Sequence, residues 1–196
     1  MSLWPMSPAQ IAHRDSLGYR AKTPIQQAAL PLAIAGKDLI AQAKTGSGKT
    51  AAFALPLLTA LNPRDFGTQA LVLCPTRELA TQVAAEIRRL ARYQQNIKVV
   101  TLCGGQPIGP QIGSLEHGAH VVVGTPGRIS DHLRKQTLTI DRIKTLVLDE
   151  ADRMLEMGFV DDLTAIVALT PAERQTLLFS ATYPDDIKSL SDRFQR

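Results

Sequence analysis

The sequence predicts a doubly wound α/β fold, in which a parallel β-sheet carries helices on both faces. Three observations support this prediction: short β-branched runs recur along the 196 residues, stretches with helical spacing separate them, and the runs are apolar at nearly every position. A continuously apolar strand is covered on both faces, as in parallel sheets, whereas a half-exposed strand alternates apolar and polar residues. Regular alternation of strand and helix then favours the doubly wound arrangement.

The expected elements alternate along the chain. About the first 35 residues are expected to be a helical preamble, because Ser7-Pro8 and Thr23-Pro24 each pair an N-cap residue with a proline suited to a first helical turn. Strands are expected at residues 39–41, 70–73, 99–102, 120–123, 145–148 and 176–179. A helical face between the second and third strands consists of Leu79, Val83, Ile87 and Leu90, and a last helix is expected over residues 184–193.

Composition places the chain among globular proteins of about one domain. Hydrophobic residues make up 44% of the chain and charged residues 20%, which excludes disordered and collagen-like classes. Lys and Arg number 22 and Asp and Glu 18, giving a net charge of +4 that permits nucleic-acid binding without indicating it. We expect a single domain over residues 1–196.

The sequence shows no sign of a membrane-spanning or secretory segment. No apolar run approaches the roughly 18 residues that span a bilayer, and the first residues lack the charged and apolar regions of a signal peptide. Cys74 and Cys103 are the only cysteines, too few for a disulfide or zinc framework. We therefore expect two reduced, buried thiols in a cytoplasmic protein.

A glycine-bearing turn after the first expected strand has the pattern of a phosphate-binding loop. It consists of Ala43, Lys44, Thr45, Gly46, Ser47, Gly48, Lys49 and Thr50, with alanine where the general pattern has its first glycine. The glycines let backbone N–H groups converge on phosphate oxygens, and the helix that follows adds its positive end. The Lys49 ammonium is expected at the β- and γ-phosphates and the Thr50 hydroxyl at Mg²⁺. The alternative is an ordinary Gly/Ser turn.

Two carboxylates follow the apolar run 146–148, at the carboxyl end of an expected parallel strand. Side chains at that end point into the ligand crevice of such sheets. We expect Asp149 to hold Mg²⁺ through water, and Glu150 to orient or deprotonate an attacking water. The alternative is an acidic pair that interacts favourably with a helix N-terminus.

Asp149, Glu150, Ala151 and Asp152 spell DEAD, and the motifs around them resemble those of DEAD-box ATP-dependent RNA helicases in order and spacing. Those motifs lie at Gly18-Tyr19 with residues 23–26, at 75–80, at Gly104-Gly105, at 125–128 and at 180–182. The resemblance runs from about Leu17 to the end and implies a RecA-like P-loop NTPase domain. The strings 70–75 and 101–107 look most like one bacterial branch of the family, which acts in assembly of the large ribosomal subunit.

The resemblance also implies roles for individual residues. Gln26 would read the edge of adenine and Tyr19 would stack on its face, so ATP rather than GTP is expected. RNA would bind without sequence preference to Pro75, Thr76, Arg77, Gly104, Gly105, Gln106, Thr125, Pro126, Gly127 and Arg128. Ser180 and Thr182 would hydrogen-bond Asp152 and couple the state of ATP to RNA separation. Taken alone, residues 125–128 also fit a turn before a helix, and 180–182 a helix cap.

The same resemblance implies parts that the sequence does not contain. Family members carry a second RecA-like domain with arginine fingers, and the bacterial branch carries a C-terminal RNA-binding domain. We therefore expect a piece of a longer, monomeric helicase that acts on ribosomal RNA and is nearly inactive without its second domain in cis. Lys22 departs from a position where the family often has proline, and an aromatic residue that usually precedes the Gly18 motif would fall near Met1.

Two other function classes remain open at this point. A P-loop kinase also uses such a loop on a parallel sheet, but it needs an acceptor pocket and usually a basic lid, and no lid-like arginine cluster follows the loop. A binding module that merely holds nucleotide would leave Glu150 without a role in turnover.

Overall fold

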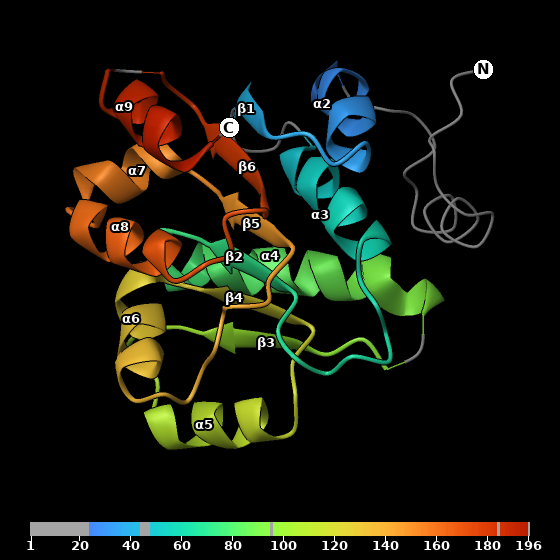
Figure 1. Ribbon diagram of the computed structural model, residues 1–196, viewed down its shortest axis with the longest axis vertical. Helices are drawn as coiled ribbons and strands as arrows, with labels where there is room; N and C mark the ends of the chain where they lie inside the picture. Colours follow the sequence, from blue (N-terminus) through green and yellow to red (C-terminus); the bar gives the residue numbers. More distant parts are fainter. Residues whose placement is uncertain (1–23, 44–47, 95, 184, 196) are drawn as a thin grey trace.

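The computed structural model describes residues 24–43, 48–94, 96–183 and 185–195 and contains a six-stranded parallel sheet with helices on both faces (Figure 1). The strands are β1 (Leu39–Gln42), β2 (Ala70–Leu73), β3 (Val99–Leu102), β4 (Val121–Gly124), β5 (Thr145–Leu148) and β6 (Gln175–Ser180). The helices are α2 (Pro24–Ile34), α3 (Lys49–Thr59), α4 (Arg77–Leu90), the 3-10 turn η1 (Ala91–Tyr93), α5 (Ile108–Glu116), α6 (Pro126–Arg134), α7 (Ala151–Glu156), α8 (Val160–Ala168) and α9 (Asp185–Phe194). The predicted fold class is confirmed.

The strands lie in the order β1-β6-β5-β2-β4-β3, and all neighbouring pairs are parallel. Strands β2, β4, β5 and β6 are buried at every position, which is why their sequences are continuously apolar. Since side chains alternate along a strand, successive residues enter two different cores. On β2, Ala70 and Val72 join the core under α2, α3 and α4, whereas Leu71 and Leu73 join the core under α6, α7, α8 and α9.

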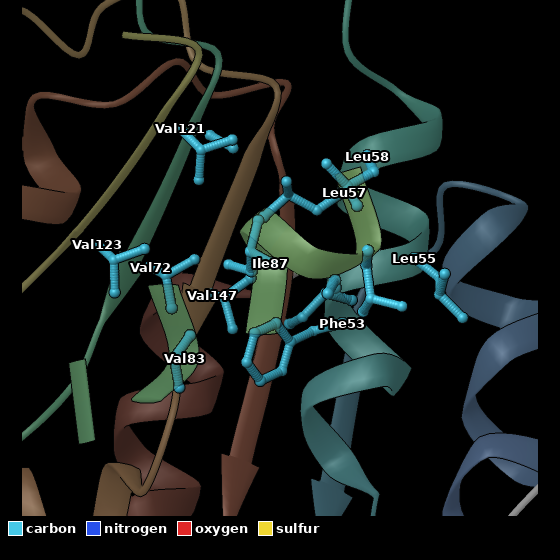
Figure 2. Close-up of a cluster of buried hydrophobic side chains, with 14 of the residues drawn as sticks. Phe53, Leu55, Leu57, Leu58, Val72, Val83, Ile87, Val121, Val123 and Val147 are labelled. Atoms are coloured by element: carbon cyan, nitrogen blue, oxygen red, sulfur yellow. The ribbon is translucent and has the colours of Figure 1, made fainter. Parts of the chain in front are cut away.

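The first of these cores packs α3 and α4 against the sheet. Figure 2 shows Phe53 of α3 and Ile87 of α4 converging on Val147 of β5. The Phe53 ring also lies against Phe179, with ring centroids 5.4 Å apart. Burial of such aromatic side chains anchors α3, the helix that begins directly after the expected phosphate loop.

Five predicted strand boundaries were wrong by one residue: the first strand ends at Gln42, the fourth runs from Val121 to Gly124, and the sixth runs from Gln175 to Ser180. His120, just before the fourth strand, is a buried polar residue whose ring accepts a hydrogen bond from the Lys98 amide (3.0 Å) and contacts the Pro63 carbonyl (2.9 Å). The sixth strand begins early, at Gln175, whose amide donates to the carbonyls of Ala33 and Lys37 at the end of α2. Sequence periodicity does not register such long-range hydrogen bonds.

Helix α4 has the predicted face with one change. Val83, Ile87 and Leu90 are buried, but Leu79 is only partly buried, and Ala80 takes its place in the core. Cys74 and Cys103 are free and buried, as expected. Ser7-Pro8 and Thr23 lie outside the described residues. None of the described helices has the length and apolar character required to cross a membrane.

Replacing Gly124 with alanine is expected to destabilise the fold by about 3 kcal/mol, the upper range for overpacking a tight site. A Cβ atom there would overlap the Leu102 carbonyl oxygen of the neighbouring strand and lie 2.8 Å from the Ile129 Cδ1 atom. Urea denaturation measures the change in unfolding free energy. Gly109→Ala on α5 is the control, since a Cβ there meets nothing within 4 Å and should be neutral or slightly stabilising. Similar values for the two variants would contradict the packing argument.

Candidate active site

The carboxyl ends of all six strands lie along one edge of the sheet, because every strand is parallel. Neighbours β1, β6 and β5 bring together Ala43, the end of β6 and the acidic residues after 148. The Ala43 amide donates to the Ser180 carbonyl (2.9 Å), and the Gln42 side chain donates to the Ala181 carbonyl (3.2 Å). Of the expected nucleotide residues, Ala43 and the acidic pair after β5 therefore lie in the same half of this sheet edge.

Only part of the expected phosphate loop belongs to the described residues. Tyr19, Lys44, Thr45, Gly46 and Ser47 lie outside them. Gly48 takes φ = 82°, a left-handed backbone that favours glycine, and directly precedes α3. The Gln26 side-chain amide donates to the Gly48 carbonyl (3.1 Å), so α2 is tied to the base of the loop.

Lys49 and Asp149 form a buried ion pair at the centre of this region. Lys49 Nζ lies 3.0 Å from Asp149 Oδ1 and 3.7 Å from Glu150 Oε1. The Asp149 side chain is fully buried, and that burial raises the pKa of its carboxyl, while Lys49 opposes the rise. Two charges buried together are costly to separate unless another charge replaces one of them.

The residues present fit a magnesium ion. Asp149 Oδ2 is buried and accepts no hydrogen bond from any residue that the structure describes, which leaves a carboxylate oxygen available to a ligand. Thr50, one residue into α3, carries the hydroxyl expected beside it. Oxygen donors from one carboxylate and one hydroxyl suit Mg²⁺, which keeps waters and phosphate oxygens in its remaining positions.

Glu150 occupies the turn between β5 and α7 with φ = 52° and ψ = 53°, a left-handed backbone that is uncommon for a residue with a side chain. Its carboxylate lies between Lys49 and Arg153, whose Nη1 atom is 3.8 Å from Glu150 Oε2. Strained backbone of this kind is often found at functional sites.

Asp152 joins the acidic segment to the end of β6. Its Oδ2 atom accepts hydrogen bonds from the Thr182 hydroxyl (2.9 Å) and the Thr182 amide (3.2 Å). Burial acts to raise the pKa of Asp152, but the hydrogen bonds from Thr182 and from the Arg153 amide outweigh it and lower the pKa. The implied contact between Asp152 and Thr182 is present, and Ser180, also implied as a partner, is buried beside it on β6.

The expected RNA residues lie on the other half of the same edge, after the neighbouring strands β2, β4 and β3. Thr76 caps α4 by accepting from the Leu79 amide (3.3 Å), and Arg77 beside it is exposed. The Thr125 hydroxyl accepts from the Gly104 amide (3.4 Å), and Arg128 donates to the Gln106 carbonyl (2.8 Å). Of the remaining expected residues, Gly105 has a left-handed backbone, Pro75 is buried at the end of β2, and Pro126 and Gly127 begin α6.

Two residues that sequence analysis did not single out hold this half together. The Gln111 side chain donates to the Cys103 carbonyl (3.0 Å), and its oxygen accepts from Arg128 (3.1 Å) and from His132 (2.8 Å). His132 is fully buried, and burial and the Arg128 charge both lower its pKa, so the ring stays neutral near pH 7. The i, i+4 spacing of Arg128 and His132 on α6 is the sequence signal that these two side chains lie on one face of the helix, where both can reach Gln111.

Comparison with known proteins gives a consistent result. A family model described as DEAD/DEAH box helicase matches residues 23–190. The chain is 59% identical over 191 residues to the ATP-dependent RNA helicase DbpA of Escherichia coli (strain K12), covering 97% of this chain and 42% of that protein. It is 52% identical over 180 residues to the ATP-dependent RNA helicase CshA of Listeria monocytogenes serovar 1/2a, covering 92% of this chain and 34% of that protein.

A solved structure agrees with the fold. The crystal structure of a DEAD box protein from the hyperthermophile Methanococcus jannaschii matches with a TM-score of 0.93 at 42% identity, covering 97% of this chain and 52% of that one. The chain spans less than half the length of the two helicases above. DbpA represents the bacterial branch that residues 70–75 and 101–107 resemble.

Replacing Lys49 with alanine is expected to lower the free energy of unfolding of the nucleotide-free chain by about 3 kcal/mol at neutral pH, because Asp149 loses its buried partner. The pKa of Asp149, already raised by burial, then rises further. The native state binds a proton that the unfolded state releases, so the loss of stability shrinks as the pH falls toward about 4.

Urea denaturation at pH 7 and at pH 5 measures this effect. The double variant Lys49→Ala with Asp149→Asn should recover most of the stability, since no buried charge is left alone. A loss that is the same at both pH values and persists in the double variant would contradict the ion-pair explanation.

The lowered pKa of His132 predicts a pH dependence of stability. Since the unfolded histidine binds a proton more readily than the native one, the stabilisation is fully present above about pH 6.5 and is lost as the pH falls toward the lower native pKa. His132→Asn should therefore lose less unfolding free energy than the wild type between pH 7 and pH 5. His117→Asn, at an exposed position, should keep the wild-type difference, and an unchanged difference in His132→Asn would count against the assignment.

Proposed function

This chain belongs to the DEAD/DEAH box helicase family, and from that membership we propose that it is the ATP- and RNA-binding half of an ATP-dependent RNA helicase, a single RecA-like domain over residues 1–196. One observation supports this most directly. The nucleotide residues and the RNA residues occupy adjacent halves of one sheet edge, and the Asp152–Thr182 contact lies in the nucleotide half, linking the acidic segment to the end of β6.

The nucleotide half would bind ATP in three parts. The loop from Ala43 to Thr50 surrounds the phosphates, Gln26 reads the adenine edge, and Tyr19 stacks on the base. The hydrogen bond from Gln26 to the Gly48 carbonyl supports this proposal, because it ties the residue expected at the adenine directly to the end of the phosphate loop. Mg²⁺, when bound with ATP, supplies charge neutralisation at the phosphates, and Asp149 and Thr50 are the residues that would hold it.

In the proposed reaction, Lys49 exchanges one anionic partner for another. Its ammonium leaves Asp149 and binds the β- and γ-phosphates, which frees the Asp149 carboxylate for its own ligand. Glu150, beside it, orients and deprotonates the water that attacks the γ-phosphate. The raised pKa of Asp149 in the nucleotide-free state supports this exchange, since the carboxylate is costly to keep charged without a close cation.

The second half would hold RNA by its backbone. Exposed backbone at Gly104 and Gly105, together with the hydroxyl of Thr76 and the guanidinium of Arg77, suits phosphate contacts that carry no base sequence. Contacts to 2′-hydroxyls would distinguish RNA from DNA. Asp152 and Thr182, with Ser180, would transmit the state of the nucleotide to this surface, so that hydrolysis is coupled to local separation of a short duplex.

The whole protein would require more than this domain. The family pattern supports a second RecA-like domain in cis, which supplies arginine fingers and completes the RNA surface, in a monomeric cytoplasmic protein. The resemblance of residues 70–75 and 101–107 to one bacterial branch of the family is what supports ribosomal RNA as the substrate and assembly of the large ribosomal subunit as the process. Without arginine fingers, the isolated domain would turn over ATP slowly, because such a finger contributes roughly 10³- to 10⁵-fold in other NTPases.

Replacing Glu150 with glutamine is expected to reduce RNA-stimulated ATP turnover by about 10²-fold or more, since glutamine cannot accept the proton of the attacking water. The affinity for ATP should remain within a few fold, because Lys49 and the phosphate loop are unchanged. Phosphate release and nucleotide binding are measured in the protein with its second domain present. Glu156→Gln, at an exposed position on α7, is the matched control and should keep full turnover. Unchanged turnover in Glu150→Gln would favour a non-catalytic nucleotide-binding module.

A further inference from the structure

A groove runs along the outer edge of β3, the last strand of the sheet, between α4 and α5. It consists of a cavity of about 440 Å³ that continues into a second one, and the two share Arg88, Val99, Val100, Pro110 and Ser114 among their lining residues. Figure 1 shows α5 beside β3 at this border of the sheet. No residue proposed above to bind nucleotide lines the groove.

The groove carries positive charge without compensation. Arg77, Arg88 and Lys98 line it, and no Asp or Glu does so among the described residues. No carboxylate of a described residue lies within ion-pair distance of Arg77 or Arg88. The next residue along α4, Arg89, differs in this respect, because it pairs with Glu86 at 3.3 Å. An uncompensated basic groove favours an anionic ligand.

The groove is continuous with the proposed RNA face. Arg77 and Gln106 belong to both. Along α4, Arg77, Thr81 and Arg88 follow one another at i, i+4 and i+11 on the side that faces the groove, which corresponds to about 16 Å of helix. A chain of phosphates that leaves the RNA face at Arg77 would therefore meet Arg88 further along the same helix.

We propose that this groove is a second RNA-binding segment, which holds the backbone of a single strand where it extends beyond the RNA face, with Arg88 as the far phosphate contact. This inference rests on the proposed function. A polypeptide strand added to the edge of β3 is the less favoured occupant, because the Arg88 guanidinium already occupies the Val99 carbonyl at 2.8 Å. Hydroxyls of Thr81, Thr101 and Ser114 add neutral hydrogen-bonding groups suited to phosphate and sugar oxygens.

The test compares two oligouridylates, one just long enough for the RNA face and one several nucleotides longer. The affinity of each is measured by fluorescence anisotropy with a non-hydrolysable ATP analogue present. The wild type should bind the longer RNA more tightly, and Arg88→Ala should reduce that gain by about threefold or more. The slope of log Kd against log salt for the longer RNA should fall by about 0.7, the value for one lost phosphate contact on a single strand.

Two further variants keep the result interpretable if Arg88→Ala disturbs the edge of the sheet. Ser114→Glu places a carboxylate in the groove without removing the Arg88 side chain, and it should weaken binding of the longer RNA in the same way. Thr164→Glu on α8 is its matched control, because Ser114 and Thr164 are both exposed and both donate to the carbonyl four residues earlier. Arg89→Ala is the control for Arg88→Ala, and both controls should match the wild type.

The outcomes separate the two proposals. If the wild type binds RNA but Arg88→Ala and Ser114→Glu bind the longer strand as it does, the groove holds no RNA and the inference is overturned. If the wild type binds neither RNA, the proposed function fails and the inference fails with it.

Discussion

The buried ion pair between Lys49 and Asp149 is the interaction on which the rest of the site depends. It joins the first turn of α3 to the end of β5 across the intervening β6. It also holds the Lys49 ammonium beside an anion, in the role that a polyphosphate would take when it binds. The pair satisfies two charges that burial would make expensive to leave alone. It also sets a condition on any ligand, since an anion that attracts Lys49 must leave Asp149 with another cation. A nucleotide together with a divalent metal meets both conditions at once.

The strand order then determines where each function lies. Since all strands are parallel, the loops at their carboxyl ends lie along one edge of the sheet. The loops after β1, β6 and β5 form one half of that edge, and the loops after β2, β4 and β3 form the other half. Polar side chains fix the two halves locally: buried Gln26 and exposed Thr182 in the first, and buried Gln111 and His132 in the second. Strand β5 of the first half pairs directly with β2 of the second, so backbone hydrogen bonds join the two halves.

Much of this arrangement could be predicted from the sequence, and the exceptions have a common cause. The six strands, the two-sided burial and the positions of Lys49, Asp149 and Arg128 follow from apolar runs, spacing and motifs, which are local signals. The early start of β6 at Gln175 depends on partners far along the chain, and so do the contacts of the His120 ring and the contact of Gln111 with His132. A buried polar residue can be recognised only once its distant partner is known. For the same reason, the sequence alone does not show that Arg88 lacks a carboxylate partner, because that depends on which distant residues surround it.

The left-handed backbone at Glu150 bears on which residue can occupy that position. A residue with a Cβ pays about 1 kcal/mol in that conformation, and glycine would relieve the penalty. Glycine would also remove the carboxylate that lies 3.7 Å from Lys49. Glutamate at position 150 therefore combines a conformational cost with an acidic group beside a buried cation, which is where the proposed reaction needs one.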